Sequence, residues 1–147
     1  MINHIKRMKM KKIILIIAII VLTITACSSN CPKKELLAAG EAIQNQVTRF
    51  ESASAIADST PRMQLGAQLI NLDKIRSDTK VIEIPVCMEQ YKKSVVFSMD
   101  NIILGFTAFM AQEKDSVIIQ HFKDARKYMD FAIGELDRLA KCAPNCE

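Results

Sequence analysis

Apolar residues recur at helical spacing in four segments of the chain. The pattern is clearest near the C-terminus, where intervals of four and three residues alternate. The apolar residues of this segment are Ile118, Phe122, Ala125, Met129, Ala132, Leu136 and Leu139. Such spacing predicts a helix that packs nearly antiparallel to its neighbours along one face. We expect Ser116 to cap its N-terminus and Pro144 to lie beyond its end.

Three earlier segments have the same character. We expect the first helix over Pro32–Asp58, because proline lacks only an N–H that the first helical turn leaves unpaired. The second begins at Thr60-Pro61, with a capping residue followed by proline, and the third runs from Pro85 to Gln112. Between the second and third helices, Ser77–Ile84 is expected to be irregular or extended, because the helical period breaks and a proline follows.

These elements predict an all-α protein. Connections of a few residues favour antiparallel neighbours, so the expected architecture is an up-down-up-down four-helix bundle, with another all-α packing as the alternative. Aromatic residues make up 5% of the chain and Trp is absent. A core built mostly from aliphatic side chains and Met suits helices better than a small β-sandwich.

The N-terminal stretch differs from the rest of the chain. The first twelve residues contain five basic side chains and no acidic one, and they are followed by Ile13–Ile24, which is apolar except for Thr23. A basic segment, a short apolar segment and a small-residue cleavage site are typical of a secretory signal peptide. A membrane-spanning helix needs about 20 apolar residues, so this run is too short for a comfortable anchor.

The end of this leader is more specific. Ile24-Thr25-Ala26-Cys27 resembles the lipobox of bacterial lipoprotein precursors. The resemblance implies cleavage before Cys27 and a diacylglyceryl group on its sulfur, which would anchor the protein in the cell envelope. The expected location is the periplasmic face of the outer membrane if the host has one, and otherwise the outer face of the cell membrane. The alternative is an ordinary signal peptide that happens to end at a cysteine.

The expected removal of this leader divides the chain into segments and changes the net charge of the part that remains. We expect a signal peptide over residues 1–26, a lipidated tether over 27–31 and a helical domain over 32–147. The whole sequence has a net charge of +4, but the leader holds five of its 20 basic residues and none of its 16 acidic ones. From Cys27 onward, 15 basic residues face 16 acidic ones, which leaves −1. We therefore expect no nucleic-acid partner.

Four cysteines follow Cys27, and in an exported chain an even number suggests disulfides. They are Cys31, Cys87, Cys142 and Cys146. In an antiparallel bundle they fall at three helix ends of one pole, next to the lipid site. We favour Cys31 and Cys87 each joined to one of the C-terminal pair, since a Cys142–Cys146 bridge leaves the other two ends untied. A four-thiolate metal site is the alternative, although the spacing lacks the C-x-x-C of zinc motifs.

The mature chain lacks the residue patterns of the common catalytic and cofactor sites. Its single histidine, His121, is too few for a Glu-x-x-His di-iron site, and C-x-x-C-H, G-x-S-x-G and glycine-rich phosphate loops are absent. We therefore expect no enzyme, no metal and no cofactor besides the lipid on Cys27. One glycine falls in each predicted helix, which favours close helix approach over room for a ligand. These glycines are Gly40, Gly66, Gly105 and Gly134.

The third helix is apolar on two sides, because Phe97, Leu104, Ala108 and Ala111 lie opposite its main apolar stripe. Either the Ser77–Ile84 connection covers this second side or it is an interaction surface. We expect a membrane-anchored, non-enzymatic lipoprotein whose bundle binds a protein partner or a second copy through this face. The alternative function is binding of a small apolar ligand between helices, lined by Met and Phe.

Overall fold

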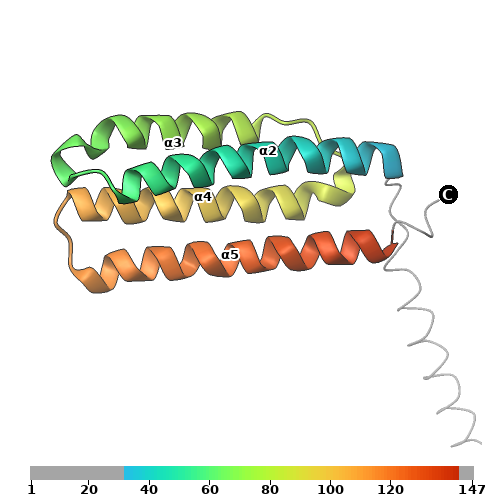
Figure 1. Ribbon diagram of the computed structural model, residues 1–147. Helices are drawn as coiled ribbons and strands as arrows, with labels where there is room; N and C mark the ends of the chain where they lie inside the picture. Colours follow the sequence, from blue (N-terminus) through green and yellow to red (C-terminus); the bar gives the residue numbers. More distant parts are fainter. Residues whose placement is uncertain (1–31, 143–147) are drawn as a thin grey trace, which may run out of the picture.

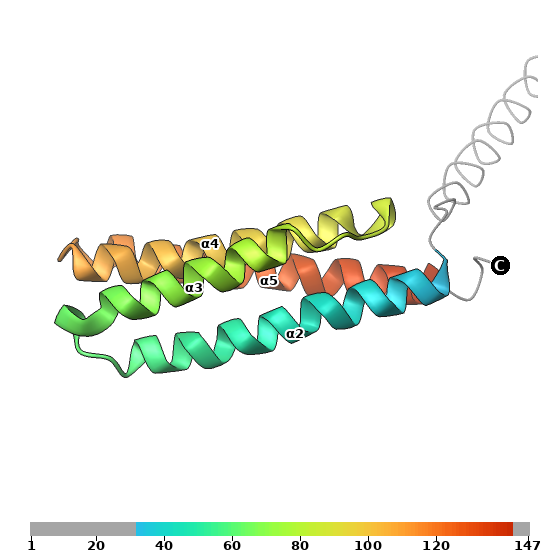
Figure 2. The ribbon, with the colours of Figure 1, turned by 90° about the horizontal axis from the view of Figure 1, so that it is seen from above.

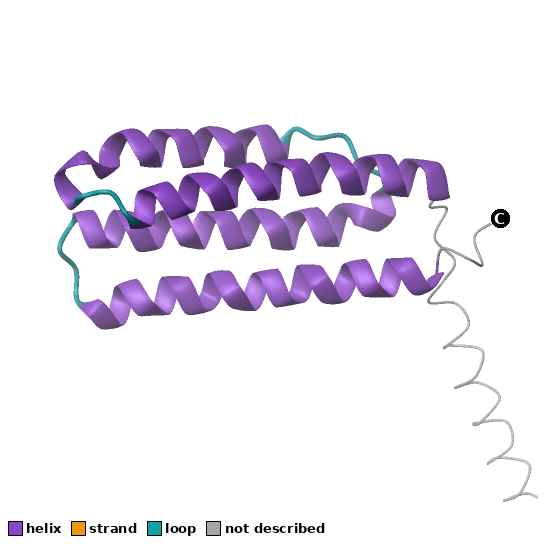
Figure 3. Cartoon of the chain, viewed as in Figure 1, coloured by secondary structure: helices purple, strands orange, loops and turns teal. Residues whose placement is uncertain are grey.

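The computed structural model describes residues 32–142, without the side chain of Cys142. The expected leader (1–26), the tether (27–31), Pro144 and Cys146 lie outside this part of the chain. The described residues form helices, turns and short connections without a β-strand, so the all-α prediction is confirmed (Figure 3). The four long helices are α2 (Lys33–Asp58), α3 (Leu65–Lys80), α4 (Glu89–Met110) and α5 (Asp115–Cys142).

The long helices lie lengthwise next to one another (Figures 1 and 2). The start of α2, the start of α4 and the end of α5 lie at one end of the molecule, which we call the Lys33 end. The α2–α3 and α4–α5 connections lie at the other end. Two short 3₁₀ turns, η2 (Arg62–Gln64) and η3 (Val86–Met88), precede α3 and α4. Thus Pro61 and Pro85 each precede a 3₁₀ turn and do not begin an α-helix.

The helix α3 is longer than its apolar pattern predicts. The prediction of an irregular or extended segment over Ser77–Ile84 is wrong for its first four residues, because α3 continues as far as Lys80. Thr79 is fully buried and its hydroxyl donates to the Ile75 carbonyl at 2.8 Å, so a polar residue continues the buried face. The Lys92 ammonium then donates to the carbonyl oxygens of Lys80 and Ile82 at 3.1 and 2.8 Å, which satisfies one acceptor in the last residue of α3 and one just beyond it.

The turn between α4 and α5 is closed by backbone hydrogen bonds. The N–H of Glu113 donates to the Ala108 carbonyl at 3.0 Å and that of Gln112 to the Phe109 carbonyl at 3.2 Å, as in a Schellman motif. Gln112 takes the left-handed position with φ of 58°. With its side-chain amide turned so that the oxygen faces Arg62, Gln112 accepts from both terminal nitrogens of Arg62 at 2.9 and 3.1 Å. The next helix begins at Asp115, so Ser116 lies in its first turn and the expected cap is wrong.

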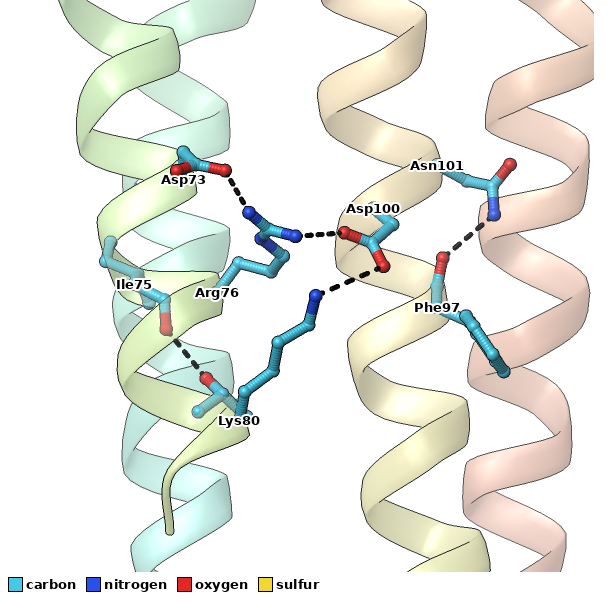
Figure 4. Close-up of polar contacts among 8 residues, drawn as sticks. Asp73, Ile75, Arg76, Lys80, Phe97, Asp100 and Asn101 are labelled. Atoms are coloured by element: carbon cyan, nitrogen blue, oxygen red, sulfur yellow. Dashed lines mark hydrogen bonds and ion pairs between the residues drawn. The ribbon is translucent and has the colours of Figure 1, made fainter.

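The core lies among α2, α3 and α4, where the largest fully buried side chains come from all three helices. These side chains include Ile43, Leu65, Leu72, Val95 and Met99. Arg76 on α3 bridges Asp73 on its own helix and Asp100 on α4, the latter at 2.9 Å (Figure 4). Lys80 also approaches Asp100, at 4.0 Å. These ion pairs hold α3 against α4 over the core.

The helix α4 is the most apolar of the described helices. Val86–Met110 is the only described segment long and apolar enough to cross a membrane. A core helix satisfies the same test, and nine residues of α4 are buried against its neighbours. The structure explains the apolar character of α4 by packing on several sides.

Candidate functional site

Small residues bring α4 and α5 close together. A Cβ added to Gly105 would lie 2.9 Å from Cζ of Phe122, closer than ordinary packing allows. Ser94, Ser98 and Ala108 share this side of α4 by helical spacing and are buried. Sequence reasoning missed this stripe, because it followed large apolar residues; the signal was small residues at intervals of four, seven and three.

The other glycines do not mark close contacts. The nearest atom to a Cβ on Gly40 is the Met88 methyl at 3.9 Å, which is ordinary contact, and none lies within 4 Å at Gly66 or Gly134. The expectation of close helix approach is therefore confirmed for Gly105 and wrong for Gly66 and Gly134. Only Gly105 occupies a position where the neighbouring helix needs the space.

A groove with a volume of about 380 Å³ lies where α2, α4 and α5 meet. We call it the α2–α5 groove, because α2 and α5 form its walls and α4 its floor. Most of its lining side chains are apolar: Val47, Phe50, Met99, Ile102, Phe122, Ala125 and Met129. Two of these are Met and two are Phe, the residue types expected to line an apolar site between helices.

The polar groups of the groove are few and come from all three helices: Glu51 and Ser54 from α2, Ser98 from α4 and Arg126 from α5. Glu51 on α2 and Arg126 on α5 line it, and both side chains are exposed to solvent. Neither takes part in any ion pair within the described part of the chain. The hydroxyl oxygen of Ser54 is buried at the groove and has no hydrogen-bond partner among the described residues. An unsatisfied buried hydroxyl is uncommon in proteins and is a point where a bound polar atom can be received.

One side of α5 is left uncovered beside this groove. Four large side chains at helical spacing, which we call the α5 row, are substantially exposed: Ile119 (50%), Phe122 (37%), Ile133 (60%) and Leu136 (39%). Phe122 and Leu136 belong to the stripe that sequence predicted to be packed against neighbouring helices. The backbones of α2 and α5 make little contact, whereas α4 and α5 pack closely, so only half of the stripe is covered.

The predicted interaction face on α4 is only partly present. Phe97 and Leu104 are about half exposed and Ala111 is exposed, but Ala108 is buried at 3% exposure. Ala108 is therefore not part of a surface, because it lies on the small-residue side toward α5. The Phe97 ring meets the Tyr128 ring of α5, with centroids 5.4 Å apart.

The connection after α3 does not bury this face. Val81 is 78% exposed, while Ile82 and Ile84 pack against the core. The alternative prediction, that this connection covers the second apolar side of α4, is therefore wrong for Val81, which is exposed. The connection also leaves Phe97 and Leu104 about half exposed.

The structure gives Cys87 as disulfide-bonded. Cys27, Cys31 and Cys146, and the side chain of Cys142, lie outside the described part of the chain. Cys87 belongs to η3, which precedes α4, and Cys142 is the last residue of α5; the start of α4 and the end of α5 both lie at the Lys33 end (Figure 1). The pairing of the four cysteines stays a prediction.

Burial raises the pKa of Tyr91, which is a core residue of α4. Within residues 32–142, no group of three or more His, Cys, Asp or Glu side chains could hold a metal ion. The comparisons with protein-family models, curated proteins and solved structures gave no match to this chain.

Proposed function

We propose that this chain is an exported, lipid-anchored, non-enzymatic protein that binds a small apolar ligand in the α2–α5 groove. The observation that carries the proposal is the groove itself. Its volume of about 380 Å³ falls within the roughly 300–1,000 Å³ of small-molecule sites. Such sites are lined mainly by apolar side chains with a few polar groups that orient the ligand, and this groove has that composition.

The proposal includes the framework of the protein. The helices would form an up-down-up-down bundle, held at the Lys33 end by two disulfides that join Cys31 and Cys87 each to one of Cys142 and Cys146. The lipid on Cys27, implied by the lipobox, would anchor this end in the cell envelope. The support for this arrangement is that α2 and α4 begin, and α5 ends, at the same end of the molecule.

The test uses the exported chain, produced from the full sequence with Cys27→Ser to remove the acylation site. Mass spectrometry verifies leader removal and disulfides, and circular dichroism verifies helix content. We then titrate the apolar fluorophore 1-N-phenylnaphthylamine and expect saturable binding of one molecule per chain. Ser54→Phe fills the groove and should reduce the affinity about tenfold or more. Ser52→Phe is the matched control, because Ser52 lies on the exposed side of the same helix.

Two results would contradict this function. One is the absence of saturable binding by a folded chain. The other is equal affinity of the Ser54→Phe variant and the parent protein, which would place the fluorophore elsewhere.

A second candidate function is protein interaction, which the α5 row favours. Rows of exposed apolar side chains at helical spacing are typical of surfaces that receive another helix. Here the partner would be another protein or a second copy, and Phe97 and Leu104 would extend the contact surface on α4. Analytical ultracentrifugation of the parent protein and an Ile133→Glu variant tests self-association. A parent protein that stays monomeric at all concentrations excludes the second copy.

A further inference from the structure

The two charged side chains of the α2–α5 groove have opposite signs and stand on opposite walls. Glu51 belongs to α2 and Arg126 to α5, and neither has an ion-pair partner among residues 32–142. Lack of an ion pair in this part of the chain is shared by other exposed charges, such as Glu41 on α2 and Lys123 on α5, but only Glu51 and Arg126 also line the groove. The groove therefore presents one acidic and one basic group to whatever enters it.

We infer that the ligand is a single-chain amphiphile with a zwitterionic head group, of the lysophospholipid class. The inference rests on the proposed function and names its ligand. An anionic head group would be attracted by Arg126 and repelled by Glu51, and a cationic one the reverse. A head group that carries both charges is attracted by both walls. Its hydrocarbon chain would lie on the apolar floor, against Met99 and Ile102.

The buried hydroxyl supports this assignment. Ser54 lies three residues after Glu51, which puts the two side chains on neighbouring turns of one face of α2. Its Oγ has no hydrogen-bond partner in the described part of the chain, so it can donate to an ester carbonyl or accept from a hydroxyl. A lysophospholipid carries both groups between its head and its chain. The groove has charged groups at its rim, then the Ser54 hydroxyl, then an apolar floor. This order matches that of the head group, the glycerol ester and the hydrocarbon chain in the ligand.

The test compares three probes that share a twelve-carbon chain: lauroyl lysophosphatidylethanolamine, dodecanoate and dodecyltrimethylammonium. Each displaces 1-N-phenylnaphthylamine from the Cys27→Ser exported chain below its critical micelle concentration. We expect the zwitterionic probe to bind about two- to fivefold more tightly than either singly charged probe. The factor is small because exposed charge pairs contribute modestly.

Two variants reverse the preference. Arg126→Gln leaves Glu51 alone and should favour dodecyltrimethylammonium, whereas Glu51→Gln should favour dodecanoate. The matched controls are Lys123→Gln on α5 and Glu41→Gln on α2, which are exposed charges that do not line the groove. These controls should keep the parent ranking. A purely structural role of Glu51 or Arg126 would lower all three affinities together and would not reorder them.

The outcomes separate this inference from the function on which it rests. If the fluorophore binds and Ser54→Phe blocks it, but the three probes bind equally or the variants keep the parent ranking, the head-group assignment is wrong and the apolar site remains. If the fluorophore does not bind at all, the proposed function itself is wrong.

Discussion

The two sides of α5 differ in how well they are covered. Toward α4, Gly105 and other small residues allow close approach, and Ala125, Ala132 and Leu139 are buried. Toward α2 the backbones stay apart, a groove opens, and the α5 row remains exposed. Regular spacing of apolar residues along a helix therefore does not determine what fraction of those residues is buried. The neighbouring helix decides that through the size of its facing residues.

The largest expected difference in stability between the two sides of α5 is at two of its leucines. Leu139 is 3% exposed and Leu136 is 39% exposed, although they are one turn apart. We expect Leu139→Ala to lower the free energy of unfolding by about 2–5 kcal/mol, because it removes buried methyl groups and leaves a cavity. Leu136→Ala should cost less than about 1 kcal/mol. Urea denaturation measures both, and equal losses would refute the difference between the two sides.

The next test concerns the close contact of α4 and α5. Gly105→Leu places a side chain against the Phe122 ring and should lower the free energy of unfolding by about 1–3 kcal/mol. Gly134→Leu is the matched control, since no atom lies within 4 Å of its added Cβ. We expect the control to raise the free energy of unfolding by up to about 1 kcal/mol through helix propensity. Stabilisation by Gly105→Leu would show that α5 is not held close.

A smaller effect is expected at the turn that joins these two helices. Gln112 adopts φ of 58°, a conformation in which glycine is unstrained. Gln112→Gly should therefore raise the free energy of unfolding by about 1 kcal/mol, provided that no side-chain contact is lost. Because the Gln112 side-chain oxygen, in the orientation that faces Arg62, accepts from that residue, the gain is measured in an Arg62→Ala background. A loss of stability in that background would contradict the strained turn.

The smallest effect on stability is expected in the α5 row. Ile133 is 60% exposed, so Ile133→Glu should change the free energy of unfolding by no more than about 0.5 kcal/mol. The preceding residue, Ala132, is 1% exposed, and Ala132→Glu buries a charge beside α4. Thermal unfolding followed by circular dichroism should show a cooperative transition near the parent temperature for the first variant alone. Two variants of equal stability would mean that both sides of α5 are exposed alike.

Sequence reasoning located the long helices to within a few residues except around α3. There Thr79 continues the buried face, so a rule that counts only apolar residues ended the helix too early. The candidate site was anticipated only in kind, as a space lined by Met and Phe. Its position was not, because no local pattern states that α2 and α5 stay apart. Ala108 was assigned to a surface for the same reason, since its helix face was known but the neighbour on that face was not.

The positions of the helices follow from local features of the sequence, because apolar spacing and prolines act within one segment and its nearest turns. The sequence also leads to the expectation of an exported, lipid-anchored chain, which rests on a contiguous basic, apolar and cysteine-ended leader. Only the tertiary structure decided which side of each helix is covered. Burial depends on residues distant in the chain, such as Gly105 and Phe122, and their close approach pairs α5 with α4 and leaves the α2–α5 groove open.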